Sequence, residues 1–252
     1  MKTNKLITRR EAILGGLTAA SGLILTGCSK NLPPTYGNIL RMGDNLTYSV
    51  QRTLLPEQSL VKEYSHQDIS SFPATGTTNP GDPATPKYSE LYRGLQSGGF
   101  ADWRLSIEGR VARPASFSIA ELKRLPSRTQ ITRHTCEEGW SAIGEWTGVP
   151  LSRVLDAAGL LPDARFVSFY SYDDWADSID LIDALHPQTL LAYGMNGRDL
   201  PIAHGAPLRL RVERQIGYKS MKYLKRIVVT SELDDGGDKG SSKNGWAWYV
   251  GI

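Results

Sequence analysis

The sequence of 252 residues predicts a mixed α+β domain in which strands outnumber helices. Several short stretches alternate apolar and polar residues with a period of two, which is typical of strands with one buried face. The helical patterns are few, short and interspersed among these strands, which favours a mixed α+β fold over a doubly wound nucleotide-binding fold. Neither a P-loop nor a Rossmann glycine fingerprint is present.

Residues 1–27 are predicted to be an export signal and are left out of the fold. A basic start is followed by an apolar stretch, residues 13–25, which is shorter than the roughly 20 residues that a membrane-spanning helix needs. The segment 8–14 (TRREAIL) resembles the twin-arginine signal, an address read by a pathway that exports folded proteins. We therefore expect the chain to fold in the cytoplasm and to act in the periplasm or cell envelope.

Residues 25–28 (LTGC) resemble a lipoprotein cleavage box. In this interpretation Cys28 becomes the lipid-bearing N-terminus and brings the protein to a membrane surface. The alternative is an ordinary signal peptide that is cut nearby, which would leave Cys28 without a lipid.

Removal of the signal changes the charge balance. The segment carries four basic residues and one acidic residue, so Lys+Arg falls from 29 to 25 and Asp+Glu from 26 to 25. The remaining chain is nearly neutral, which removes the electrostatic basis for nucleic-acid binding.

Residues 28–99 are rich in Pro, Gly, Ser and Thr and are predicted to form a tether followed by an irregular arm. Scattered aromatic and aliphatic residues, such as Tyr64 and Tyr92, predict that the arm packs on the main domain, residues 100–252.

The main domain begins with a strand in which Trp103, Leu105 and Ile107 share one face. Ser118 and Glu121 form a capping box that predicts a short helix. A second helix is predicted at 150–158, and an Asn-Gly turn at 196–197 predicts a hairpin. The other expected strands lie at 128–136, 165–172, 189–193, 208–213 and 223–230.

Cys136 is left as the single internal cysteine, at the end of the strand 128–136. Basic residues precede it and two glutamates follow, and nearby cations favour the thiolate that binds metals. The open alternatives are a buried apolar thiol, an intermolecular disulfide, or a hydrolytic nucleophile with His134 as its base.

Five ordered segments resemble the molybdopterin-binding oxidoreductases of the sulfite oxidase fold, in particular the catalytic subunit of periplasmic methionine-sulfoxide reductase. The resemblance covers about residues 100–230. The segments are 136–141 (CEEGWS), 146–151 (WTGVPL), 185–190 (LHPQTL), 205–209 (GAPLR) and 217–222 (GYKSMK).

The resemblance implies a Mo-molybdopterin cofactor whose molybdenum is bound by Cys136, the catalytic residue. It also implies pterin contacts from Ser171, His204, Arg209 and the run 220–222, that is Ser220, Met221 and Lys222. Cations such as Arg209, Lys219 and Lys222 suit the phosphate of such a cofactor. From the residues alone, the favoured interpretation of Arg209 and Arg211 is the solvated face of a strand, and that of His204 is a capped loop histidine.

The predicted activity is a two-electron oxygen-atom transfer on a small substrate. Sulfite oxidases have basic residues after the metal-binding cysteine, whereas Glu137 and Glu138 stand there in this sequence and favour a neutral sulfoxide. The resemblance also implies a membrane haem protein as electron partner. The alternatives are a sulfite-oxidase-type enzyme and a lipid-anchored binding protein of the same fold without redox activity.

Overall fold

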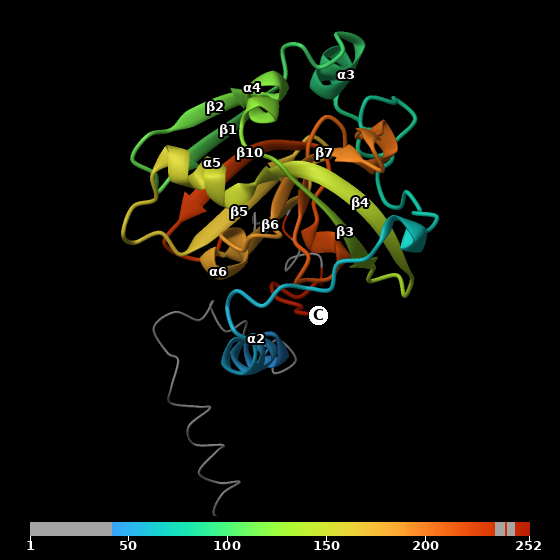
Figure 1. The fold of residues 1–252 in the computed structure, drawn as a ribbon. Coiled ribbons are helices and arrows are strands. Elements are labelled where there is room, and N and C mark those ends of the chain that lie inside the picture. Colours follow the sequence, from blue (N-terminus) through green and yellow to red (C-terminus); the bar gives the residue numbers. More distant parts are fainter. Residues whose placement is uncertain (1–41, 235–239, 241–244) are drawn as a thin grey trace, which may run out of the picture.

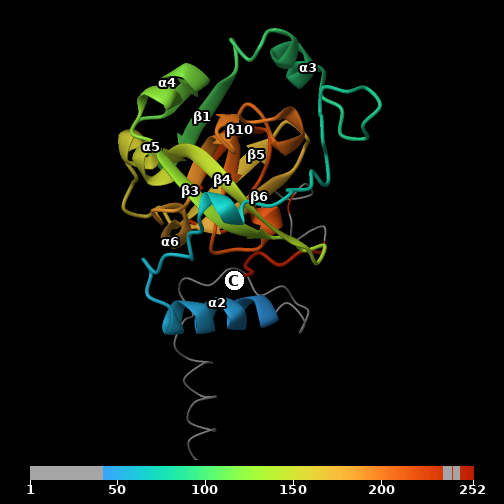
Figure 2. The same ribbon diagram turned by 45° about the vertical axis from the view of Figure 1, so that its right-hand side comes forward.

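The computed structural model describes residues 42–234, 240 and 245–252. The predicted signal segment, Cys28 and residues 29–41 lie outside the described residues. The described chain forms two five-stranded sheets that lie over one another, with helix α2 (Met42–Leu54) below them and α3 (Glu90–Ser97) at the opposite end (Figure 1, Figure 2). Among the described residues, no helix is long and apolar enough to cross a membrane.

The first sheet has the strand order β2-β1-β10-β5-β6. Strands β1 and β10 pair in parallel and all other pairs are antiparallel. The strands are β1 (Arg104–Gly109), β2 (Ala115–Ser118), β5 (Phe166–Ser171), β6 (Ala176–Asp180) and β10 (Leu224–Thr230).

The second sheet has the order β3-β4-β7-β8, and β9 pairs with β7. Asn196 and Gly197 have φ angles of 50° and 72° and connect β7 to β8 in the predicted hairpin. The strands are β3 (Arg128–Thr135), β4 (Ser141–Pro150), β7 (Leu190–Met195), β8 (Arg198–Asp199) and β9 (Arg209–Arg211).

Capping residues mark the ends of the helices in the main domain. The capping box of Ser118 and Glu121 opens α4 (Ile119–Arg124) as predicted. Helix α5 (Leu151–Ala158) ends at Gly159, whose φ of 72° suits glycine. Asp180 accepts a hydrogen bond from the backbone of Asp183 and so caps α6 (Leu181–Ala184).

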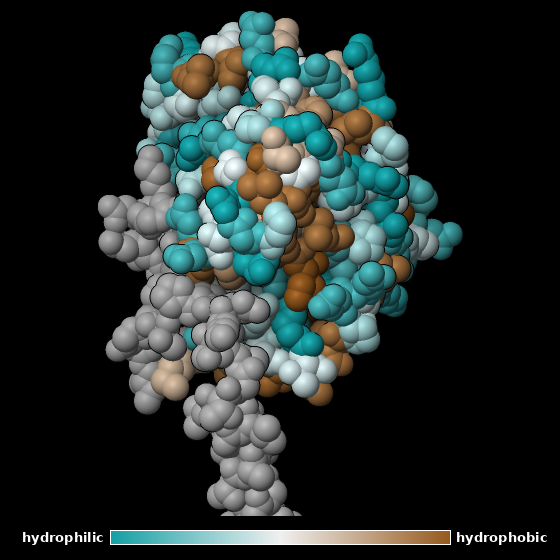
Figure 3. Space-filling model, turned by 90° about the vertical axis from the view of Figure 1, so that its left-hand side faces the viewer, coloured by the Kyte–Doolittle hydropathy of each residue, from teal (hydrophilic) through white to brown (hydrophobic). Residues whose placement is uncertain are grey.

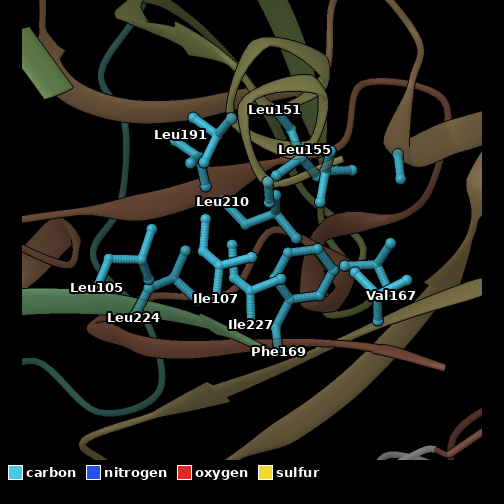
Figure 4. Close-up of a cluster of buried hydrophobic side chains, with 14 of the residues drawn as sticks. Leu105, Ile107, Leu151, Leu155, Val167, Phe169, Leu191, Leu210, Leu224 and Ile227 are labelled. Atoms are coloured by element: carbon cyan, nitrogen blue, oxygen red, sulfur yellow. The ribbon is translucent and has the colours of Figure 1, made fainter. Parts of the chain in front are cut away.

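The main core lies between the two sheets. Leu105, Ile227 and Phe169 from the first sheet point toward Leu191 of β7 and Leu155 of α5 (Figure 4). On the outer face seen in Figure 3, hydrophobic residues form a band that is bordered by hydrophilic ones.

Most predicted elements of the main domain are confirmed, namely β1, α4, β3, α5, β5, β7, β8 and β10. Strands β2, β4 and β6 were missed. The strand expected over 208–213 is shorter, because only Arg209–Arg211 pair with β7.

The arm is less irregular than expected, since α2 and α3 both lie within residues 28–99. Tyr92 of α3 is buried against Tyr172 and Tyr223, whereas Leu54 and Leu91 are exposed.

Candidate active site

Cys136 is the first residue of the loop that connects β3 to β4, as expected from its place at the strand end. Its backbone N–H donates to the carbonyl of Trp140 at 2.9 Å, and its carbonyl accepts from the N–H of Gly139 at 3.1 Å. These two bonds hold the thiol in place while its side chain faces a cavity of about 370 Å³.

The cavity gathers residues from distant parts of the chain. Six of the seven predicted site residues line it: Cys136, His204, Arg209, Ser220, Met221 and Lys222. The residues that the sequence did not indicate include Phe72, Thr75, Thr77, Asp173, Tyr218 and Trp246.

The electrostatic surroundings of the thiol differ from the sequence-based expectation. Burial, and to a smaller extent the Glu137 carboxylate, raise the pKa of Cys136 to about 11. Arg133, the cation expected to favour the thiolate, turns away and stacks on Tyr64 with 5.4 Å between its Cζ and the ring centre. The expectation of an acidified free thiol is therefore wrong, and a bound metal would have to displace the thiol proton.

Arg209 places a positive charge in the wall of the cavity. Its Nη1 and Nη2 donate to the carbonyls of His204 and Ser220 at 3.0 and 2.7 Å. Its buried Nε has no hydrogen-bond partner among the described residues, and burial together with Arg211 lowers the pKa of the guanidinium to about 9. A buried cation without a carboxylate partner in the described chain favours an anionic ligand.

Lys222 adds a second cation beside Arg209. Its Nζ donates to the carbonyls of Thr75 at 2.8 Å and Ala203 at 3.2 Å, and also to that of Thr77. Burial and the nearby Arg209 lower its pKa to about 8. The lysine thus ties the arm to the main domain in addition to contributing charge to the cavity.

Two glycines allow close backbone approach at the same wall. A Cβ atom on Gly205, whose φ is 109°, would lie 2.8 Å from Cβ of Lys222. A Cβ atom on Gly217 would lie 2.6 Å from Nε2 of His134. The resemblance implies a pterin that bears a phosphate, and the cavity wall fits this cofactor. It offers two cations, the Nε–H of Arg209, which is unpartnered within the described chain, and two glycines that allow close approach of the backbone.

Ser171 is the predicted site residue that does not line the cavity. Its Oγ lies within hydrogen-bond distance of the Asp173 carboxylate and of the Trp175 carbonyl, which share its single proton, and it accepts from the Trp175 N–H at 3.1 Å. Ser171 therefore holds the turn that presents Asp173 and Trp175 to the cavity, and Trp175 is a wall residue.

The cation expected from Lys219 does not reach the cavity. Lys219 is fully buried, and its Nζ donates to Asp177 at 2.5 Å and to the carbonyl of Ser178 at 3.0 Å. The side chain of Lys219 therefore points away from the cavity and does not contribute to phosphate binding there. The sequence could not show this orientation.

Arg211 and Glu213 form a buried ion pair beneath the cavity, so the solvated strand face that the residues alone allowed is wrong. Arg211 donates from Nε and Nη2 to the two carboxylate oxygens of Glu213, at 3.0 and 2.8 Å. The guanidinium groups of Arg211 and Arg209 lie 4.4 and 4.9 Å from the ring centre of the buried Trp146. Trp146 is thus a core residue that also supports the cationic wall.

His134 is fixed by the same pair. Nη1 of Arg211 lies 2.7 Å from Nδ1 of His134. Because arginine only donates, Nδ1 accepts and a neutral ring carries its hydrogen on Nε2. Burial, with Arg211 and Arg209, lowers the pKa of His134 to about 2, so the ring is neutral at physiological pH.

The arm forms the remaining wall. Phe72 packs against His134, Trp140, Trp146 and His204, with ring centres 5.2 to 5.8 Å apart. No local pattern in residues 72–77 indicates this role, because the segment has neither periodicity nor a charged motif.

Carboxylates stand on the side of the cavity next to the thiol. Glu137 and Glu138 both line it, and Glu138 accepts a hydrogen bond from Nε1 of Trp140 at 2.9 Å. Asp173 lies deeper, and burial raises the pKa of its carboxyl.

Comparison with known proteins identifies the family. The sequence model of one protein family, the oxidoreductase molybdopterin-binding domain, matches residues 95–237 of this chain. A putative protein-methionine-sulfoxide reductase subunit of Azospira oryzae is 33% identical over 243 residues, which cover 96% of this chain and 86% of that protein. The catalytic subunit of the protein-methionine-sulfoxide reductase of Xanthomonas axonopodis is 36% identical over 149 residues, covering 53% of this chain and 46% of that subunit.

Among solved structures, the sulfane dehydrogenase SoxCD of Paracoccus pantotrophus is similar with a TM-score of 0.51 and 25% identity. The match covers 54% of this chain and 40% of that chain. The expected fold class and cofactor class are therefore confirmed, and the chain belongs to the family of oxidoreductases with a molybdopterin-binding domain.

Proposed function

We propose that this molybdopterin-dependent oxidoreductase reduces a sulfoxide to the corresponding thioether. The observation that carries the proposal is the pair Glu137 and Glu138 beside Cys136 in the cavity wall. Carboxylates there oppose an anion such as sulfite. A neutral, polar S=O group suits this side of the cavity better. The names of the related reductase subunits agree with this substrate class.

In this proposal Cys136 binds the molybdenum, and Arg209, Lys222 and the segment 220–222 hold the pterin and its phosphate. When bound, the molybdenum supplies two-electron oxygen-atom chemistry between its IV and VI states. In the net reaction, one sulfoxide, two electrons and two protons give one thioether and one water. The S–O bond breaks and its oxygen leaves as water.

The protein's own contribution is orientation and exclusion of water. The Glu213–Arg211 pair fixes the ring of His134 through the bond to Nδ1. Phe72, Trp140 and Trp175 provide apolar walls, and aromatic rings make favourable contacts with the sulfur of a thioether. These walls fit the groups on either side of a sulfoxide.

Steady-state turnover tests the substrate class. The purified holoprotein, with reduced viologen as electron donor, is expected to reduce dimethyl sulfoxide and methionine sulfoxide and to oxidise sulfite poorly. The control is Cys136→Ser, which should retain the fold and lose molybdenum and activity. Oxidation of sulfite without any sulfoxide reduction would overturn the proposal.

We also propose that the chain is exported in the folded state and anchored by a lipid on Cys28. The support is the segment TRREAIL followed by LTGC, together with a cofactor class that requires folding before export. Labelled palmitate should enter the wild-type protein and not Cys28→Ser, and replacing Arg9 and Arg10 with lysine should retain the protein in the cytoplasm. Incorporation of palmitate into Cys28→Ser would contradict the assignment.

The electron donor in the cell is proposed to be a membrane haem protein. The resemblance to the reductase catalytic subunit supports this partner class. Co-purification of haem with the lipidated protein from solubilised membranes, and haem reoxidation when sulfoxide is added, would be the expected result. Undiminished sulfoxide reduction in membranes depleted of haem would argue against it.

A further inference from the structure

Helix α2 has an exposed face without any charged residue. Met42, Leu46, Val50 and Leu54 are spaced four residues apart and are 49%, 49%, 43% and 72% exposed. The other exposed positions of the helix are Gly43, Thr47 and Thr53. An ordinary surface helix shows the opposite arrangement, with its apolar stripe toward the protein.

The polar face of α2 is fixed against the main domain. Arg52 donates to both carboxylate oxygens of Asp180 at 2.9 Å and lies 3.0 Å from the fully buried Asp183. Tyr48 packs on Trp248 and Tyr249, with ring centres 5.0 and 5.1 Å apart. Because unpairing two buried carboxylates is costly, the helix cannot turn its apolar face inward.

Isolated exposed apolar residues are common on protein surfaces. On the face of the molecule seen in Figure 3, for example, hydrophobic residues are bordered by hydrophilic ones. The face of α2 differs because the stripe is continuous and uncharged. It lies at the end of the molecule opposite α3, below both sheets (Figure 1, Figure 2).

Chain length indicates what covers this face. Met42 follows Cys28 by 14 residues, so an extended chain lets the helix lie at most about 50 Å from the lipid. Apolar side chains gain free energy at a membrane interface in proportion to the area that leaves water. A second copy is a poorer occupant, because a face about 20 Å long and 10 Å wide offers far less than the roughly 800 Å² per partner of a stable interface.

We propose that the uncharged face of α2 lies in the interface of the membrane that carries the Cys28 lipid. The helix then sets the orientation of the domain on the bilayer, and the lipid sets its attachment. This inference rests on the proposed lipidation of Cys28.

Site-directed spin labelling of the lipidated holoprotein tests the proposal in vesicles of phosphatidylethanolamine and phosphatidylglycerol. Labels are placed at Leu46→Cys or Val50→Cys, and the matched control is Leu91→Cys on α3, where Leu91 is 66% exposed. Cys136 is buried and only 5% exposed, so the introduced thiol is the one that reacts. Molybdenum content verifies the fold of each variant.

The ratio of collision with oxygen to collision with a nickel chelate is expected to be several-fold higher at positions 46 and 50 than at 91, because oxygen enters the apolar part of the bilayer and the chelate stays in water. Frequent collision of the nickel chelate with labels at 46 and 50 would overturn the proposal, because it would mean that the face lies in water. Infrequent collision with both reagents would also overturn it, because it would mean that a second copy or residues 29–41 cover the face of α2. Mass analysis of Cys28 separates the two proposals. An unmodified Cys28 refutes the lipid anchor, whereas a lipidated chain with water-exposed labels refutes only the role of α2.

Discussion

Nη1 of Arg211 donates a hydrogen bond to Nδ1 of His134 across 2.7 Å, and both side chains are buried. The two residues are 77 positions apart in the chain, and the same guanidinium is held by both carboxylate oxygens of Glu213. One ion pair thus fixes the ring orientation of a residue two positions before the predicted metal ligand.

Loss of Arg211 should destabilise the protein strongly. Arg211→Met leaves Glu213 buried without its cation, which should lower the free energy of unfolding by about 3–5 kcal/mol. Urea unfolding of the cofactor-free protein measures the change. The double variant Arg211→Met with Glu213→Gln removes both charges and should recover most of the loss. A single variant that loses less than about 1 kcal/mol would show that the pair is not a structural element.

Gly217→Ala should disturb the site without unfolding the domain. The added methyl group would lie 2.6 Å from Nε2 of His134 and 3.1 Å from the carbonyl of Thr135, so the ring or the loop has to shift. Lower molybdenum content per chain is expected. Gly94→Ala is the matched control, because its Cβ meets nothing within 4 Å in the exposed helix α3 and should stabilise the protein by about 0.5–1 kcal/mol. Full molybdenum content in Gly217→Ala would contradict the close packing.

Arg209→Gln should weaken cofactor retention more than it weakens the fold. Removal of an unpaired buried charge offsets part of the loss of its bonds to His204 and Ser220. A charge-assisted hydrogen bond contributes about 1.5–3 kcal/mol, so pterin retention should fall at least about tenfold. Fluorescence of the released pterin measures it, and Arg226→Gln, at an exposed ion pair, should retain the cofactor. Equal retention in both variants would exclude Arg209 from the cofactor site.

The stability of the cofactor-free protein should fall in mild acid. Burial, with Arg209 and Lys222, lowers the pKa of His204 to about 4 from its ordinary value near 6.5. Between these values the unfolded chain binds more protons than the folded one, so stability is lost as the pH falls from about 6.5 to about 4. Thermal unfolding at several pH values should therefore show a smaller loss for His204→Asn than for the wild type. An unchanged profile would show that His204 does not contribute. The residual slope reports the other groups whose pKa folding shifts, among them His134, His186 and Asp173.

The sequence by itself determined much of the local structure of the main domain, although it did not reveal β2, β4 and β6. Alternation of apolar residues placed β1, the capping box at Ser118 placed α4, and the Asn-Gly pair placed the β7–β8 hairpin. These signals are local, because a strand's period, a cap and a turn depend on neighbouring residues. The ordered motifs around Cys136 likewise identified the family and its cofactor, which the comparisons confirmed.

Only the tertiary structure decided which side chains face the cavity. Lys219 and Lys222 are three residues apart, yet one pairs with Asp177 and the other reaches the cavity wall. Arg211 has the spacing of a solvated strand face but is covered by β3 and Trp146. The arm segment around Phe72 reaches the cavity through contacts with residues more than 60 positions away. Such contacts depend on how sheets and arm pack together, and no local pattern in the chain records which face will be covered.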